Sequence, residues 1–311
     1  STITALVTQR SGLVLVAGRR STAASAPATT SDVGPLGAVT ADGVALALRR
    51  TPPAGSGRGA VLLTHAMMVD GRYLAPVATA LAAAGLDAYV LDWRGHGASR
   101  PPDPRRDRWT FDDYVTFDLP CALAAVARAA GCARAQVGVL GHSLGGLVTL
   151  AALGTGAIDV ARVALVATSV WLPGPRGPRA RRALMATYQA VADALGYAPI
   201  RALRLGTADE PAGYVAQLAG WARTGRWTSA GGADYLAALA HVTATTRAWV
   251  GAGDRLCTVA DARALTDRIP GARLRPVGRA HGDALDPDHF TLCTRPAMAP
   301  VWAELADALA P

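Results

Sequence analysis

The stretch VGVLGHSLGGL, residues 137–147, decides the fold class of this chain. An apolar run typical of a buried strand ends at Leu140, and an apolar helix is predicted from Leu144. Between them, Gly141 to Gly145 match the pattern G-x-S-x-G, which places Ser143 on a sharp turn between strand and helix. The glycines allow a strained backbone and close packing. The pattern predicts a serine hydroxyl at a helix N-terminus, where backbone N–H groups favour developing negative charge.

Strands and helices are predicted to alternate on both sides of this stretch. Residues 39–49, with Asp42-Gly43 at the centre, indicate a hairpin, and short apolar runs at 60–64 and 88–91 flank a helical pattern that stops at Gly85. A helix at 111–130 and strands at 163–168, 248–251 and 272–277 continue the series, with helices near 259–268 and 296–309. This alternation predicts an α/β fold with a mostly parallel central sheet and helices on both faces.

Two segments depart from the alternation. Residues 1–36 are rich in Ser, Thr, Ala and Pro and are interpreted as an N-terminal extension. Residues 171–243 are helix-like, rich in Trp and Arg, and contain no convincing strand, so they are interpreted as an inserted helical cap. The α/β core is therefore expected to comprise residues 37–170 and 244–311.

The composition limits the classes of function. Apolar residues make up 51% of the 311 residues and charged residues 17%, which excludes a disordered chain. The net charge of +8 comes from scattered arginines, and no basic run is interleaved with stacking aromatics, so no nucleic-acid partner is expected. The four cysteines form no CxxC pair and no histidine lies at zinc-ligand spacing, so neither a metal nor a disulfide scaffold is expected.

No integral membrane segment is expected either. The uncharged run 137–158 is long enough for a membrane span, but it contains six glycines and polar residues and is interpreted as a strand, a turn and a helix. The apolar stretch 13–17 is too short for a secretory signal, and its basic pair follows it. A cytoplasmic location is the expectation.

The chain resembles the α/β-hydrolase superfamily, and within it the capped lipase, esterase and lysophospholipase-like branch. The resemblance covers residues 37–311. It is carried by five ordered segments: LLTH (62–65), DWRGHGAS (92–99), GHSLGG (141–146), GAGD (251–254) and RAHGD (279–283). It implies a serine hydrolase with a Ser-Asp-His triad in that chain order.

Three residues are predicted to form this triad. Serine needs a base to take its proton and a carboxylate to orient that base. Ser143 is the predicted nucleophile, and Asp254, which follows the strand ending at Gly251, is the predicted acid. The resemblance places the base at His281, just after the last strand, and His289 is the serious competitor.

Other predicted site residues surround the triad. The resemblance predicts that Leu144 and Met67 donate backbone N–H groups to an oxyanion hole, although the loop contains His65-Ala66 where the family usually has His-Gly. Met68, His142 and Trp171 are predicted to contact substrate, with the alternatives that Met68 and Trp171 only pack within the cap and that His142, the variable residue of the G-x-S-x-G pattern, is structural.

The predicted function is hydrolysis of a small-molecule carboxylic ester or thioester through an acyl-enzyme, with no cofactor. An acyltransferase or cyclase would use the same acyl-enzyme, and a non-catalytic ligand-binding protein is a further alternative.

Overall fold

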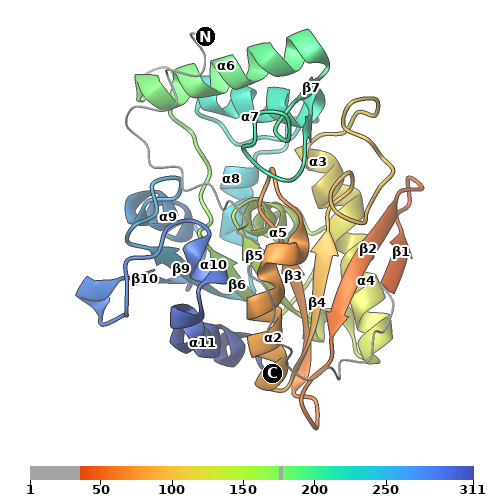
Figure 1. Cartoon of the computed structure of the whole chain (residues 1–311), viewed down its shortest axis with the longest axis vertical. Coiled ribbons are helices and arrows are strands. Elements are labelled where there is room, and N and C mark those ends of the chain that lie inside the picture. The colour runs from red at the N-terminus through yellow and green to blue at the C-terminus, as the bar shows by residue number, and fades with distance from the viewer. Residues whose placement is uncertain (1–35, 175–177) are drawn as a thin grey trace, which may run out of the picture. The chain divides into compact units, whose positions relative to one another are not determined.

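The computed structural model describes residues 36–174 and 178–311. Residues 1–35, which hold nearly all of the predicted extension, lie outside the described residues, as do residues 175–177. The described chain has the α/β architecture that the alternation predicts (Figure 1).

One eight-stranded sheet forms the centre of the fold. Its strands lie in the order β1-β2-β4-β3-β5-β6-β9-β10, and only the β1–β2 and β2–β4 pairs are antiparallel. The strands are β1 (Leu36–Val39), β2 (Ala45–Thr51), β3 (Gly59–Thr64), β4 (Leu86–Asp92), β5 (Gly138–His142), β6 (Arg162–Val166), β9 (Thr245–Gly251) and β10 (Arg273–Val277). The prediction of a mostly parallel sheet is confirmed. The carboxyl ends of the six parallel strands therefore share one edge, where ligands bind in sheets of this kind.

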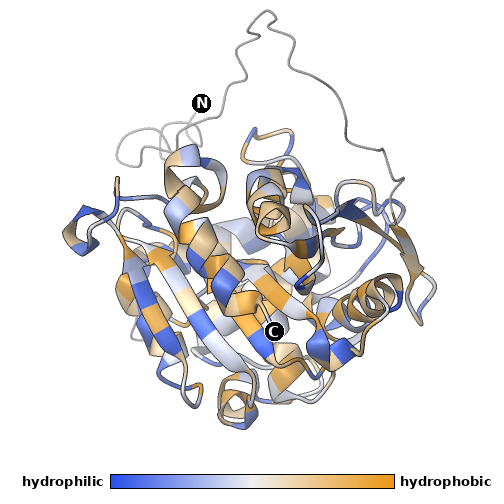
Figure 2. Ribbon diagram, turned by 90° about the horizontal axis from the view of Figure 1, so that it is seen from below, coloured by the Kyte–Doolittle hydropathy of each residue, from blue (hydrophilic) through white to orange (hydrophobic). Residues whose placement is uncertain are grey.

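Helices cover both faces of the sheet. The main ones outside the segment between β6 and β9 are α2 (Ala75–Ala83), α3 (Phe111–Asp113), α4 (Leu119–Ala130), α5 (Leu144–Gly154), α9 (Val259–Thr266), α10 (Thr291–Thr294) and α11 (Ala299–Leu309). Val61 and Leu63 of β3 belong to the hydrophobic core that contains α2 and α11, whereas Leu62 belongs to the core that contains α4 and α5. Successive strand residues point to opposite faces, so residues 60–63 of β3 are all apolar because both faces are covered. Figure 2 shows hydrophobic residues on the strands and on the flanking helices.

The uncharged run at 137–158 is divided between β5 and α5, with Ser143 between them. Among the helices of the described ranges, none combines the length and the hydropathy that a bilayer span requires.

The segment between β6 and β9 forms a helical insertion, which we define as residues 171–243. Its main elements are α6 (Arg179–Leu195), β7 (Tyr197–Ala198), β8 (Glu210–Pro211), α7 (Ala212–Thr224) and α8 (Tyr235–Ala238). Helix α6 packs on α7, and β7 and β8 form a short antiparallel ribbon that the sequence did not indicate. The rings of Trp221 and Tyr235 lie 5.0 and 5.6 Å from that of Phe111, so aromatic packing joins the insertion to the core. The division of the chain into a core and a cap as domains stays a prediction.

Glycines permit α5 to lie close to β3. A Cβ atom added to Gly145 would lie 2.6 Å from the carbonyl oxygen of Thr64, and one added to Gly146 would collide with the side chain of Thr168. No real Cβ contact is that short, so any larger residue here would push α5 away from the sheet.

We expect Gly145→Ala to lower the free energy of unfolding by about 1–3 kcal/mol, because the added methyl group overpacks the contact with Thr64. Gly220→Ala is the matched control, since Gly220 also lies within a helix but its nearest neighbour would be 4.0 Å away. The control should gain about 0.5–1 kcal/mol from the better helix propensity of alanine. Urea denaturation of the two variants measures both values, and equal effects at the two positions would contradict the packing argument.

Candidate active site

Ser143 occupies a strained turn between β5 and α5. Its backbone has φ 53° and ψ −112°, in the left-handed half of the φ range that residues other than glycine rarely adopt. Its N–H donates to the carbonyl oxygen of Val166 on β6 at 2.9 Å, which holds the turn against the sheet. Strain of this kind costs on the order of 1–3 kcal/mol and is concentrated at functional sites. Ser143 thus lies at the carboxyl end of β5 and at the N-terminus of α5, as the sequence predicts.

Asp254 lies in the turn that follows β9 and is almost fully buried. One carboxylate oxygen, Oδ1, accepts hydrogen bonds from the backbone N–H groups of Leu256 and Cys257, both at 2.8 Å. The other oxygen, Oδ2, lies 2.7 Å from Nδ1 of His289. The backbone donors therefore fix the carboxylate so that its second oxygen orients one imidazole ring.

The predicted pair of Asp254 with His281 is wrong, because His289 occupies that place. His281 ends the 3-10 helix Arg279–His281 just after β10, and it is exposed. His289 is 9% exposed and carries the bond to Asp254.

The path of the chain after β10 explains why His289, and not His281, pairs with Asp254. Asp283 accepts a hydrogen bond from the N–H of Gly278 and pairs with Arg275 at 2.6 Å, so the loop that carries His281 folds back on the end of β10. The chain returns to β9 only at Pro287, whose carbonyl oxygen accepts from the N–H of Gly253 at 3.2 Å. Two residues later, His289 lies beside Asp254.

His142 connects His289 to the loop after β3. Its Nε2–H donates to the carbonyl oxygen of His289 at 2.9 Å, and its Nδ1 accepts from the hydroxyl of Tyr73, which in turn accepts from the N–H of Ala66 at 2.9 Å. Burial lowers the pKa of His142 well below its usual range, and nearby His289 lowers it further. Both ring nitrogens are occupied and the ring is fully buried, so these contacts favour a structural position for His142. The predicted contact of this side chain with substrate stays a prediction.

Met67 and Leu144 present the backbone groups predicted for an oxyanion hole. Within the described ranges, neither N–H group has a hydrogen-bond partner in the protein. Leu144 is the first residue of α5, and Met67 lies three residues beyond β3. Unpaired N–H groups are what an oxyanion hole requires, and this role of Met67 and Leu144 stays a prediction.

The other residues predicted to contact substrate have partners in the insertion. The side chain of Met68 packs against Ala198, Ile200 and Val215. The indole of Trp171 donates to the carbonyl oxygen of Leu256 at 2.8 Å, and the guanidinium of Arg181 lies 4.7 Å from its ring. These contacts favour the packing alternative for both residues.

His65 supports the loop after β3 from the buried core side. Its ring is fully buried, with Nδ1–H donating to the carbonyl oxygen of Ala66 at 2.7 Å and Nε2 accepting from the N–H of Trp93 at 3.1 Å. Only the neutral ring offers one donor and one acceptor. Burial lowers the pKa of His65 to about 3.

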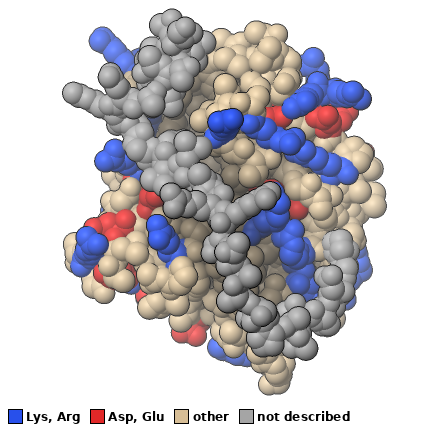
Figure 3. All heavy atoms as spheres, viewed as in Figure 1, with Lys and Arg blue, Asp and Glu red and all other residues tan. Residues whose placement is uncertain are grey.

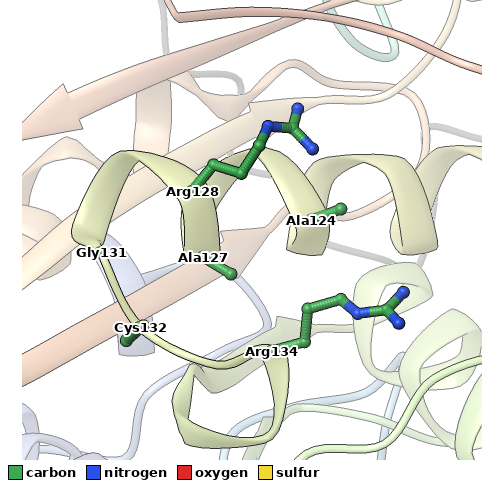
Figure 4. A pocket seen from close by; sticks show the side chains of 6 residues that line it. All are labelled: Ala124, Ala127, Arg128, Gly131, Cys132 and Arg134. Carbon is green, nitrogen blue, oxygen red and sulfur yellow. The ribbon is translucent and has the colours of Figure 1, made fainter.

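Two hollows in the described part of the chain are lined by residues other than those of the candidate site. One of about 440 Å³ lies at the C-terminal end of α4, between Arg128 and Arg134 (Figure 4). The other, of about 290 Å³, is lined by residues that include Asp87 and Pro311.

Figure 3 shows basic side chains in separate groups over one face, with acidic groups between them. Among the described residues, no group of three or more His, Cys, Asp and Glu side chains is arranged to hold a metal ion.

Comparison with known proteins identifies the family. The family model for serine aminopeptidases, S33, matches residues 55–277. The chain belongs to this family of α/β hydrolases. A search of curated proteins found no match.

Solved structures of other α/β hydrolases share the fold. An enol-lactonase from Burkholderia xenovorans LB400 is 20% identical, with a TM-score of 0.59 over 88% of this chain and 99% of its own. A thermophilic esterase from Thermogutta terrifontis is 19% identical, with a TM-score of 0.59 over 90% and 100% of the two chains. A bromoperoxidase from Bacillus anthracis is 16% identical, with a TM-score of 0.58 over 86% and 98%.

The neutral, buried His65 predicts how the stability of this hydrolase depends on pH. Below about pH 6.5 the unfolded chain binds a proton at this residue, whereas the folded chain binds it only near pH 3. The free energy of unfolding should therefore fall as the pH is lowered through this window, and the stabilisation should be complete above pH 6.5. Urea denaturation at several pH values gives the slope of the free energy of unfolding against pH. This slope should be smaller for His65→Gln than for the wild type, by an amount that corresponds to at most one proton taken up on unfolding. A charged His65 ring in NMR spectra at pH 5 would contradict the prediction.

Proposed function

We propose that this hydrolase cleaves a carboxylic ester or thioester through an acyl-enzyme on Ser143, with His289 as base and Asp254 as the carboxylate that orients it. The contact between Asp254 and His289 carries the proposal. A buried carboxylate whose other oxygen is held by two backbone donors fixes the ring with Nδ1 protonated, which leaves Nε2 as a proton acceptor.

The position of Ser143 supports the same roles. His142 precedes Ser143 in the chain and its ring centroid lies 5.0 Å from that of His289, so the base is anchored to the turn that carries the nucleophile. Within the described ranges, neither His289 Nε2 nor the Ser143 hydroxyl has a hydrogen-bond partner in the protein. Both groups are free for proton transfer.

The proposed reaction has two steps. Ser143 Oγ attacks the carbonyl carbon while its proton passes to His289 Nε2, and the N–H groups of Leu144 and Met67 bind the oxyanion. The intermediate then expels the alcohol or thiol, which takes the proton from His289. A water molecule next attacks the acyl group, with His289 again as base, and releases the acid. Asp254 stabilises the imidazolium that forms in each half-reaction.

The chemical identity of the leaving group is tested with a substrate panel. It contains p-nitrophenyl esters and acyl-thioesters of graded chain length, and aminoacyl p-nitroanilides because the matched family model is named for aminopeptidases. The proposal expects ester or thioester turnover to exceed that of the anilides. Mass spectrometry of the products with an added alcohol or amine separates hydrolysis from acyl transfer.

We expect a fluorophosphonate probe to label the chain once, at Ser143, because Ser143 is the one serine of the described ranges that lies on the turn joined through His142 to His289. Ser143→Ala should abolish both the labelling and the turnover of the best ester. Peptide mapping of the labelled protein identifies the site. Stoichiometric labelling at a different serine would reject the assignment.

We expect His289→Ala to reduce kcat by about 10³-fold or more, because the variant loses the base that Asp254 orients. His281→Ala is the matched control, since it removes an exposed histidine eight residues earlier, and its kcat should stay within about twofold of the wild type. Steady-state kinetics with circular dichroism as a folding check compares the two. A larger loss in His281→Ala would show that the loop adopts another path during catalysis.

A further inference from the structure

Glu210 is a fully buried carboxylate that the proposed triad does not use. It lies in β8 of the insertion and is 0% exposed. Its Oε1 accepts from the backbone N–H of Met68 at 2.5 Å, whereas its Oε2 has no hydrogen-bond partner among the described residues. A buried carboxylate oxygen without a partner costs stability. Stability alone therefore does not account for a glutamate at this position.

The segment that carries Glu210 binds both backbone groups of Met68. The carbonyl oxygen of Met68 accepts from the N–H of Thr207 at 2.9 Å and from that of Ala208 at 3.1 Å. Gly206 lies so close that an added Cβ atom would collide with this carbonyl. The backbone of Met68 is thus clamped from the N–H side by a carboxylate and from the carbonyl side by two amides.

This clamp holds a strained residue. Met68 has φ 65°, a left-handed conformation that is unfavourable for a side chain of this type. Such a conformation persists only where the surrounding structure over-determines it. Met68 directly follows Met67, so the orientation of the peptide groups on this loop depends on the clamp.

Glu210 also reaches the loop after β4. Its Oε1 lies 3.3 Å from Nε2 of His96, a fully buried ring whose Nδ1 lies 2.9 Å from the carbonyl oxygen of Arg94. Both ring nitrogens face acceptors, so the pair is satisfied when the ring carries both protons. Burial lowers the pKa of His96, but the neighbouring carboxylate outweighs it and the pKa is raised. One side chain of the insertion therefore joins the loops after β3 and β4.

We propose that Glu210 is a positioning residue of the reaction, which acts by holding Met68 in its left-handed conformation so that the N–H of Met67 points at the oxyanion. This inference rests on the proposed acyl-enzyme function. It assigns the insertion a part in building the oxyanion hole.

Variants at Glu210 test the proposal. Glu210→Met removes the acceptor at similar volume, and Glu210→Asp keeps the charge but withdraws it from Met68 by one methylene. Glu210→Gln keeps an acceptor in the same place. Asp209→Asn is the matched control, because the neighbouring buried carboxylate binds the N–H of Arg201 and the side chain of Arg105 rather than the loop of Met68.

The measurements are kcat and KM for the best ester and the inhibition constant of a trifluoromethyl ketone with the same acyl chain, which adds to serine as a tetrahedral oxyanion. We expect Glu210→Met to lower kcat by about 10- to 10³-fold, up to the cost of losing one oxyanion donor, with KM within about threefold. The affinity of the variant for the ketone should fall in proportion to the fall in kcat/KM. Glu210→Gln should recover most of the loss, and Asp209→Asn should match the wild type in all three constants.

Three results would overturn the inference. The first is a folded Glu210→Met enzyme with kcat and ketone affinity within twofold of the wild type. If Glu210→Met does not fold, the second result is a Glu210→Asp enzyme whose kcat and ketone affinity both equal those of the wild type. The third is a loss confined to KM. A wild type that turns over no ester or thioester and is not labelled at Ser143 would instead reject the proposed function.

Discussion

The left-handed backbone of Ser143 is the constraint on which the rest of the site depends. A residue held at φ 53° between a strand and a helix has to be supported from all sides. Gly141 and Gly145 let α5 approach the ends of β3 and β5, and the bond from Ser143 to Val166 fastens the turn to β6. Close packing of the core is thus what keeps the serine at the edge of the sheet and next to a helix N-terminus.

A chain of hydrogen bonds extends this constraint to the imidazole. His142 belongs to the same turn as Ser143, and it connects the carbonyl of His289 with Tyr73 and, through it, with Ala66. Asp254 holds the other side of the His289 ring from the end of β9. The turn of the proposed nucleophile, the proposed base and the proposed oxyanion loop are therefore linked by hydrogen bonds through the buried ring of His142, and hydrogen bonds are stronger in such a low-dielectric interior.

The insertion contributes polar contacts as well as cover. Its aromatic residues pack on Phe111, as expected for a segment that joins the hydrophobic core. Residues 206–210, however, place backbone amides and a carboxylate against Met68, at a point 142 residues away in the chain. The proposed oxyanion loop thus has two supports, His65 on the core side and Glu210 on the insertion side. Both lie next to His96, whose ring packs near the ring of His65 and whose Nε2 faces the carboxylate of Glu210.

The sequence by itself determined the order of strands and helices, the serine turn and the place of Asp254, because each depends on residues that are neighbours in the chain. Periodicity reports which residues are buried, and a strand that ends at Gly251 places Asp254 at the sheet edge whatever the rest of the chain does. Only the tertiary structure decided which histidine reaches Asp254, which way the ring of His142 faces and what holds Met68. These depend on contacts between distant segments, such as Gly253 with Pro287 and Met68 with Glu210, whose geometry no local pattern encodes. His281 and His289 follow the same strand, and the fold of the loop between them selects the one that is buried.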